Sequence, residues 1–477
     1  MRLKAFAVST ALATALLGAC ASAPLPPGTW DVRAAPQVEV TRDGDRWTAD
    51  YVFNRDAQVW AFMDSALMTD VRQPWRPTQW TVETPGVVME RRGHYDVIRA
   101  LDGGPVPRHV RFSLKPKSVY LEAEYGTLTF SDGAVALPTR QFDVFALASV
   151  EAAEAMPADL NGVDLEGGAS TVVWRDTAGP VLFNGRRHAD LTTTGERSYV
   201  LLGQARVTPG EGLTTVIDPN LPPWIGEEIR SFAPHVGDYY LRRLGAPGVG
   251  SETSTVMVSW NGPTERLSSM GGSVLPGLIV MKFEGVGVLN PNKEVQERSR
   301  WFIGHESAHF WLGQAVRYQF ARDAWITEGG ADLMAVRALK ALDPAYDDRA
   351  ELQTEVDDCI GLSRKPVAEA GDRGEHRAYY ACGAVFAMAA EGAQKRRDGG
   401  DWFDFLRPVL AANREDGVLS RAEWLDALTR VSGDPSLSAT IEKMLDQGAA
   451  DPAAEIASLF QKTGVRHRVE NGKVVLI

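Results

Sequence analysis

One short segment in the middle of this 477-residue chain places polar groups where an apolar helix is expected. The segment His305-Glu306-Ser307-Ala308-His309 is flanked by large apolar side chains, among them Trp301, Phe302, Phe310 and Trp311. A helix with such flanks is largely buried, and buried imidazole and carboxylate groups need partners. The chain must therefore fold so that another segment brings a ligand or a charge to this helix.

The spacing of the two histidines suits a metal ion. Residues i and i+4 share one face of a helix, so His305 and His309 can direct their imidazoles at one ion while Glu306 points into the same cleft. Neutral imidazoles hold a catalytic Zn²⁺, and a carboxylate beside them can take a proton from a water whose pKa the ion has lowered to about 7. We expect one Zn²⁺ per chain, with Glu306 as the general base.

A catalytic zinc takes three protein ligands, so a third must come from elsewhere in the chain. Glu328 is the candidate, since a first helix ending near Gly313, a loop and a second helix could return its carboxylate to the histidines. Asp332 lies four residues further on and so on the same face. It either accepts the outer N–H of His305 or His309 as a second-shell residue or is an ordinary solvated aspartate.

These motifs resemble the aminopeptidase N family of gluzincin zinc metallopeptidases, whose pattern is HExxH, eighteen residues and then Glu. The resemblance covers roughly residues 221–445. Upstream, Gly271 to Ile279 is similar to the family's substrate-binding strand, which implies that Gly271 and Gly272 contact substrate. Downstream, Tyr380-Ala381-Cys382-Gly383-Ala384 is similar to the segment that carries the family's catalytic tyrosine, which implies that Tyr380 stabilises the oxyanion. Tyr379 is the neighbouring competitor, and a tyrosine packed in the core is the alternative.

The chain departs from the family pattern in two places. Val274 stands where the strand motif has a glutamate, which weakens the expectation of aminopeptidase specificity. The family's large C-terminal helical domain is missing, because only about thirty residues follow Leu445, and this suggests a more open cleft.

The fold class expected is multidomain, with an all-β domain followed by a mostly helical one. Short alternating segments rich in Val, Thr and aromatic residues predict a β-rich domain over 30–218. The resemblance implies a thermolysin-like α+β, mostly α, zinc metallopeptidase domain over 219–445, and we expect a short C-terminal helical extension over 446–477. The predicted strands of the first domain include 110–114, 118–125, 198–207 and 213–217.

The first nineteen residues have the layout of a secretory signal, with Arg2 and Lys4 before a short apolar stretch. The stretch ends in Leu17-Gly18-Ala19-Cys20, which resembles the lipobox of bacterial lipoproteins and implies lipidation at Cys20. Residues 20–29 are then a Pro-rich tether. We expect a lipid-anchored protein of the bacterial cell envelope, on the outer membrane and facing the periplasm.

The net charge of the chain excludes one class of binding partner, and its cysteines allow one disulfide bond. The formal net charge is -12, so the chain offers no broad basic field and nucleic acid is excluded as a partner. An oxidising compartment would permit a disulfide between Cys359 and Cys382, and two separate buried thiols are the alternative.

The expected activity is hydrolysis of peptide bonds in the cell envelope, with a peptide as substrate. Two alternatives remain: a non-catalytic zinc-bearing binding or scaffold lipoprotein, and a metallohydrolase acting on a non-peptide bond. The intact Glu306 argues against a scaffold, because a purely structural site has no need of a base.

Overall fold

The structure is a computed structural model, which describes residues 35–122, 124–210, 213–247, 254–265 and 269–477. The predicted signal sequence, the lipidation site at Cys20 and the whole of the tether over 20–29 lie outside these residues.

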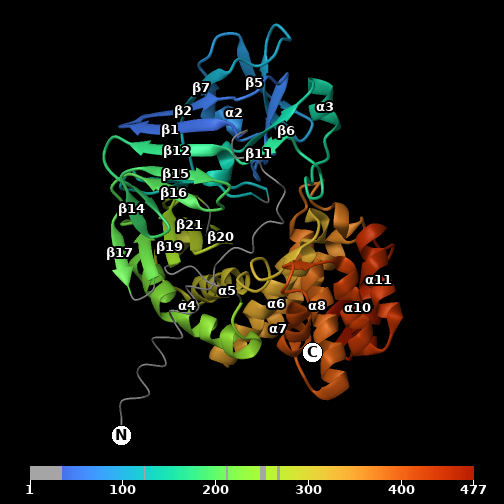
Figure 1. Ribbon diagram of the computed structural model, residues 1–477. Coiled ribbons are helices and arrows are strands. Elements are labelled where there is room, and N and C mark those ends of the chain that lie inside the picture. The colour runs from blue at the N-terminus through green and yellow to red at the C-terminus, as the bar shows by residue number, and fades with distance from the viewer. Residues whose placement is uncertain (1–34, 123, 211–212, 248–253, 266–268) are drawn as a thin grey trace. The chain divides into compact units, whose positions relative to one another are not determined.

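The chain divides into two compact units, each described here by itself. A β-rich unit contains Pro24–Leu221 and Glu252–Leu289, and a helical unit contains Pro222–Ser251 and Asn290–Ile477. The order of a β-rich part followed by a helical part confirms the predicted fold class (Figure 1).

Two sheets of the β-rich unit share one hydrophobic core. Alternating strands bury one face, as in β1, where Val38 and Val40 are buried and their neighbours are not. Trp47, Trp60 and Trp174 lie in the same core. The six-stranded sheet has the order β15(Leu191–Thr194)-β12(Thr171–Asp176)-β1(Gln37–Asp43)-β2(Arg46–Val52)-β7(His109–Leu114)-β4(Trp80–Val82), and the five-stranded sheet has the order β11(Gly167–Gly168)-β10(Val144–Leu147)-β3(Val59–Phe62)-β6(Tyr95–Ala100)-β5(Val87–Arg92).

Two further sheets complete this unit. In the second of them β18, β19 and β21 are parallel, and β17 and β20 pair antiparallel at its edges. Their orders are β14(Arg186–His188)-β13(Val181–Phe183)-β16(Tyr199–Leu202)-β9(Val135–Pro138)-β8(Leu128–Thr129) and β17(Val207–Gly210)-β18(Leu213–Ile217)-β19(Ser254–Trp260)-β21(Leu278–Glu284)-β20(Ser269–Leu275).

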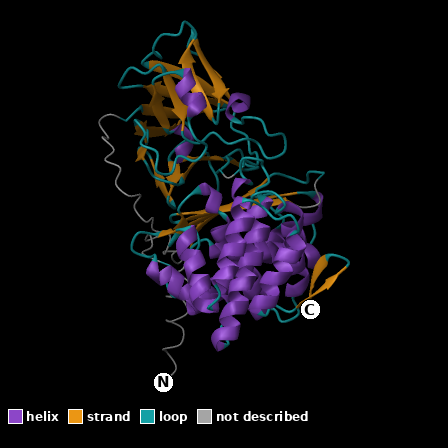
Figure 2. Ribbon diagram, turned by 90° about the vertical axis from the view of Figure 1, so that its right-hand side faces the viewer, coloured by secondary structure: helices purple, strands orange, loops and turns teal. Residues whose placement is uncertain are grey.

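The helices of the helical unit are drawn in purple in Figure 2, and one of them, α6, is buried along most of its length. A helix that is apolar nearly all round belongs in a core, and α6 packs against both α5 and α8. The helices are α4(Pro223–Leu244), α5(Lys293–Ala308), α6(Trp325–Leu342), α7(Asp348–Leu362), α8(Arg377–Asp398), α9(Trp402–Ala412), α10(Arg421–Ser432), α11(Pro435–Asp446) and α12(Pro452–Thr463), followed by the hairpin of β24(His467–Glu470) and β25(Lys473–Leu476).

The predicted strand at 118–125 is wrong for its described residues, 118–122 and 124–125, which form only an isolated bridge between Leu121 and Met68. Side chains bind the backbone on either side of that bridge. The Lys117 N–H donates to Gln79 Oε1 at 3.0 Å, and the Glu124 carboxylate accepts the backbone N–H groups of Ser65 and Ala66 at 2.7 and 2.9 Å. In addition, β19 to β21 belong to the β-rich unit, although their residues were predicted to lie in the helical domain over 219–445.

The first motif helix ends earlier than predicted. α5 stops at Ala308 instead of continuing to the neighbourhood of Gly313. Gly313 adopts a φ of 137°, which is outside the helical region and favours glycine. The turn over 309–316 sends the Leu312 carbonyl back towards His309.

Candidate metal centre

Two helix ends bring the predicted ligands together. His305 and His309 lie at the C-terminal end of α5, and Glu328 lies in the first turn of α6. The carbonyl end of α5 favours a positive charge beside its two histidines, and the N–H end of α6 favours the Glu328 carboxylate. One ligand atom of each residue lies within 4.8 Å of the others.

Hydrogen bonds on the outer nitrogens orient both imidazoles. His305 Nδ1 is 2.7 Å from Asp332 Oδ1, and His309 Nδ1 is 2.8 Å from the Leu312 carbonyl oxygen. Both partners are acceptors, so each Nδ1 carries a hydrogen and each Nε2 is the nitrogen left to bind a metal ion. The two Nε2 atoms face each other at 3.0 Å.

The three ligand atoms fit a zinc ion. The Nε2 atoms are 3.0 Å apart, and each is 3.5 Å from Glu328 Oε2. Atoms with these separations could all hold one ion at the usual zinc–ligand length of ~2.0 to 2.1 Å. Two imidazole nitrogens and one carboxylate oxygen are also a donor set that zinc accepts in catalytic sites.

The electrostatics of the centre favour a cation. Burial opposes the charged form of His305, but the Asp332 carboxylate beside it raises the pKa of the imidazole well above its ordinary value. Burial would raise the pKa of Glu328, but His309 and His305 hold it below its usual range. With Glu306 also close, carboxylates outnumber the positive groups around the two imidazoles.

Glu306 is placed to handle a proton in this centre. Its side chain is buried on α5, and burial is the largest cause that raises the pKa of its carboxyl. The two histidines lower that pKa, whereas Glu328 and Asp332 raise it. A carboxyl with a raised pKa beside a cation site is suited to a general base.

The structure separates the two candidate tyrosines. The Tyr380 ring lies against the His305 ring, with centroids 5.7 Å apart, and the Glu328 carboxylate is the largest cause that raises the phenol pKa. The Tyr379 hydroxyl instead donates to the Ala368 carbonyl at 3.1 Å and accepts the Gly371 N–H at 3.0 Å. Tyr380 therefore belongs to the centre, and Tyr379 to the loop before α8.

Sequence reasoning missed three contributors. The Leu312 carbonyl could not be found because it depends on where α5 ends. The Trp301 ring lies beside the His305 ring, with centroids 5.4 Å apart and planes tilted by 33°, and Trp301 was predicted only as a buried flank. Arg377, at the start of α8, has a nitrogen 3.9 Å from Asp332 Oδ2, and nothing in its local sequence signals this contact.

Other predicted residues lie elsewhere. Gly271 and Gly272 are in β20 of the β-rich unit, where a side chain at 271 would meet the ring of Tyr120. Their contact with substrate stays a prediction, as does lipidation at Cys20. Cys359 and Cys382 form a disulfide that links α7 to α8, which settles the alternative left open by the sequence.

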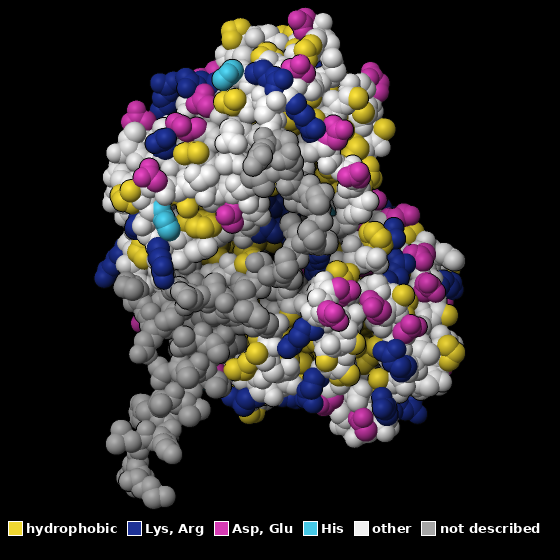
Figure 3. Space-filling model, in the orientation of Figure 1, with side chains coloured by type: hydrophobic (Ala, Val, Ile, Leu, Met, Phe, Trp, Pro, Cys, Tyr) yellow, Lys and Arg dark blue, Asp and Glu magenta, His cyan; other side chains and the backbone are white. Residues whose placement is uncertain are grey.

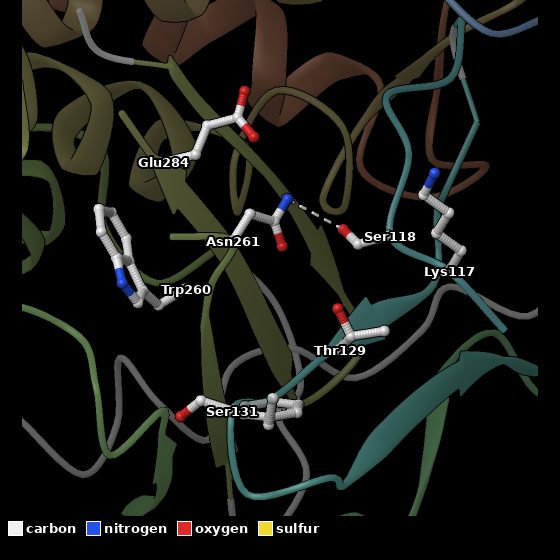
Figure 4. A pocket seen from close by; sticks show the side chains of 8 residues that line it. Lys117, Ser118, Thr129, Ser131, Trp260, Asn261 and Glu284 are labelled. Atoms are coloured by element: carbon white, nitrogen blue, oxygen red, sulfur yellow. Dashed lines mark hydrogen bonds between the residues drawn. The ribbon is translucent and has the colours of Figure 1, made fainter. Parts of the chain in front are cut away.

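A separate hollow of about 360 Å³ lies in the β-rich unit, at the carboxyl ends of parallel strands (Figure 4). Trp260 and Asn261 line it from the end of β19, Glu284 from the end of β21, and Asn261 donates to Ser118 Oγ at 3.2 Å. None of the His, Cys, Asp or Glu groupings within the described residues that could hold a metal includes these side chains.

The geometry of His305, His309 and Glu328 defines a candidate His₂Glu metal centre. No family model matches the chain, and no curated protein does. Native yeast leukotriene A4 hydrolase is 12% identical, with a TM-score of 0.49, and 90% of this chain and 71% of that chain are covered. A mutant M1 zinc metallopeptidase from Deinococcus radiodurans, bound to a Tyr-Ser-Ala substrate, is 15% identical with a TM-score of 0.45, covering 87% of this chain and 93% of that one. These likenesses are too distant to transfer an activity.

Two further observations concern the surface charge and the hydropathy of the helices. Acidic and basic side chains are interspersed on the face in view, where Lys and Arg form no large field (Figure 3). Within the part of the chain that the structure describes, no helix has the length and hydropathy that crossing a bilayer requires.

Proposed function

We propose that this chain is a zinc-dependent peptidase of the bacterial cell envelope. The observation that carries the proposal is the convergence of His305 Nε2, His309 Nε2 and Glu328 Oε2 at distances of 3.0 and 3.5 Å, with Glu306 beside them. A structural zinc site is usually closed by four protein ligands, whereas three ligands and an adjacent base are typical of hydrolysis.

Each residue of the centre has a role in this proposal. A bound zinc ion supplies a Lewis acid that polarises the scissile carbonyl and lowers the pKa of a water molecule. Glu306 takes one proton from the attacking water and passes it to the leaving amine, so that water is added across the amide bond. Tyr380 donates its phenol hydrogen to the oxyanion, and Asp332 holds His305 in the tautomer that leaves Nε2 free.

The proposed location rests on two features. The lipobox-like segment ending at Cys20 supports a lipid anchor on the outer membrane, with the protein facing the periplasm. The disulfide between Cys359 and Cys382 supports an oxidising compartment, because such bonds are rare in the cytosol. A peptide in the periplasm would then be the substrate.

Metal analysis and a peptide-library digest test the activity. We expect close to one zinc per wild-type chain, and its loss in His305→Ala, His309→Ala and Glu328→Ala. Glu306→Gln should keep zinc and fold but lose turnover, because an amide cannot take the proton. Full zinc in all three ligand variants would overturn the centre. Zinc without cleavage of any library peptide by the wild type would favour a scaffold or a non-peptide substrate.

Cell fractionation tests the anchor. Cys20→Ser should abolish acylation and release the protein from the membrane fraction. A variant that stays membrane-bound after a salt wash would show that the anchor is elsewhere.

A further inference from the structure

The Asp332 carboxylate that orients His305 is a buried charge, which is costly unless another group balances it. It is only 1% exposed. Its Oδ1 receives the His305 hydrogen, but Oδ2 is buried and makes no hydrogen bond within the described residues. A buried carboxylate oxygen with nothing to balance it is costly, and such a group tends to move towards any cation or water it can reach. Something must hold this carboxylate against His305.

Arg377 is the cation that faces Asp332 Oδ2. Its Nη1 lies 3.9 Å from that oxygen, close enough for electrostatic attraction but beyond a direct hydrogen bond. Arg377 is the first residue of α8, where the positive end of the helix dipole disfavours a cation. Its position there is therefore stabilised by its acidic neighbours and not by the helix that carries it.

Two carboxylates of α7 fix the guanidinium. Arg377 Nη2 donates to Glu355 Oε1 at 2.8 Å, and Nε donates to Asp358 Oδ2 at 2.8 Å. Glu355 is buried, whereas the Arg377 side chain is 39% exposed, so only the carboxylate of this pair is shielded from solvent. These bonds occupy two edges of the guanidinium, which leaves Nη1 directed at Asp332 and makes the side chain a poor receptor for a substrate carboxylate.

A covalent bond holds the two helices together beside these ion pairs. Cys359 follows Asp358 on α7, and its disulfide partner Cys382 lies on α8 between Tyr380 and Gly383. α7 is thus joined to α8 by a disulfide and two ion pairs within one stretch of each helix. The guanidinium has little freedom to leave Asp332.

We infer that Arg377 is a positioning residue of the metal centre, which holds Asp332 against His305 Nδ1 and is itself held by Glu355 and Asp358 on α7. The inference rests on the proposed function only in that the centre binds zinc, and it does not depend on which bond is cleaved. The residue acts through Asp332 and His305, and so its removal should weaken the metal site without removing a ligand.

Zinc affinity of the full-length protein, measured by competition with a chelator, tests the inference. Arg377→Gln should weaken zinc binding about tenfold, at the low end of the 10- to 100-fold range for outer-shell partners of ligating histidines. Arg377→Lys keeps the charge and should recover most of that loss. Arg337→Gln is the matched control. Arg337 lies on α6 and pairs with Glu391 at 2.8 Å and with Asp348 at 3.1 Å, but not with Asp332.

The control separates positioning from general stability. Both glutamine variants remove ion pairs and should lower the melting temperature, but only Arg377→Gln should change zinc affinity. Equal zinc affinity of wild type and Arg377→Gln would overturn the inference, and so would an equal loss in Arg337→Gln. If the wild type itself fails to bind zinc through its three ligands, the proposed function fails first, and the ligand variants reveal this independently.

Discussion

At the scale of single residues, two adjacent tyrosines contact different parts of the molecule. The Tyr380 ring lies against His305, whereas the Tyr379 hydroxyl is committed to the Ala368 carbonyl and the Gly371 N–H. Tyr380→Phe removes the proposed oxyanion donor and should lower kcat about 10²- to 10³-fold, or ~3 to 4 kcal/mol in the barrier, while the melting temperature stays unchanged.

Tyr379→Phe is the matched control and should behave in the reverse way. It leaves a backbone carbonyl and an N–H without their partner, which costs about 1 to 3 kcal/mol of unfolding free energy, while kcat is kept. Steady-state kinetics and thermal melts on both variants decide the matter. A large kcat loss in Tyr379→Phe with normal turnover by Tyr380→Phe would reverse the assignment.

Helical periodicity was enough to predict that His305 and His309 share a face. Glu328, on a different helix, was predicted from the need for a third ligand and from the resembling pattern, and the structure groups the three. Residue identity and spacing were not enough to choose between Tyr379 and Tyr380, since both neighbours have a phenol and the choice depends on how α8 is rotated. Arg377 was beyond reach for a related reason: its partners come from α6 and α7, and no local pattern connects them.

At the scale of helices, the centre depends on how closely α6 and α8 cross. A side chain built on Gly329 would overlap backbone atoms of Gly383, and one built on Gly383 would overlap the Trp325 carbonyl. Gly329 follows the ligand Glu328, and Gly383 lies one turn after Tyr380, so the crossing sets the separation of the carboxylate and the phenol. Gly383→Ala should force the helices apart.

We expect Gly383→Ala to lower the free energy of unfolding by about 1 to 3 kcal/mol or more, the usual cost of overpacking, and to weaken zinc binding. Gly361→Ala is the control, because Gly361 is helical in α7 and a side chain there meets nothing within 4 Å. Alanine at that position should be neutral or slightly stabilising. Chemical denaturation and chelator competition measure both effects, and normal zinc affinity in a folded Gly383→Ala would refute the link.

In the β-rich unit, a buried carboxylate makes stability depend on pH. Burial raises the pKa of Asp143 from 3.8 to about 7, although the Ser170 N–H and Arg140 act to lower it. Between these two pH values the folded state keeps a proton on Asp143 that the unfolded state has released. The contribution of this group to the free energy of unfolding is therefore fully present below about pH 4 and is lost as the pH rises to about 7. This pKa change corresponds to ~4 kcal/mol at most.

Asp143→Asn should flatten this dependence. The amide oxygen can still accept the Ser170 N–H, which is 2.8 Å from Asp143 Oδ1, but the group no longer titrates. We expect the wild-type melting temperature to be lower at pH 8 than at pH 5.5, and the difference to shrink in the variant. An unchanged pH profile would show that other groups, such as Glu124, dominate.

At the scale of the whole molecule, composition and periodicity predicted the succession of a β-rich and a helical part, since alternation and helical spacing are local properties. They did not predict that residues of 252–289 pack with the first unit, because strand partners can be distant in sequence. Parallel pairing of β18 with β19 and of β19 with β21 leaves no mark in the local pattern.

The last prediction concerns which end of a substrate the molecule recognises. In the resembling family, a glutamate of the substrate-binding strand pairs with the free α-amino group and places one residue before the zinc. The resemblance implies that Val274 takes the place of this glutamate, and the structure puts Val274 in β20, paired with Ile279 of β21 and 4% exposed. An isopropyl group offers nothing to an ammonium ion, and a charged amine brought against it would lose hydration without compensation.

We therefore expect acetylated and internal peptides to be cleaved at least as fast as peptides with a free amine. The assay compares kcat/KM for an acetylated peptide with that for its free-amine twin, and Val274→Glu serves as the companion variant. If the alignment of the strand is right, the new carboxylate should shift preference towards the free amine. A wild-type preference of about tenfold for the free amine, or ~1.4 kcal/mol in the barrier, would mean that another acid binds it and that Val274 does not occupy the amine site.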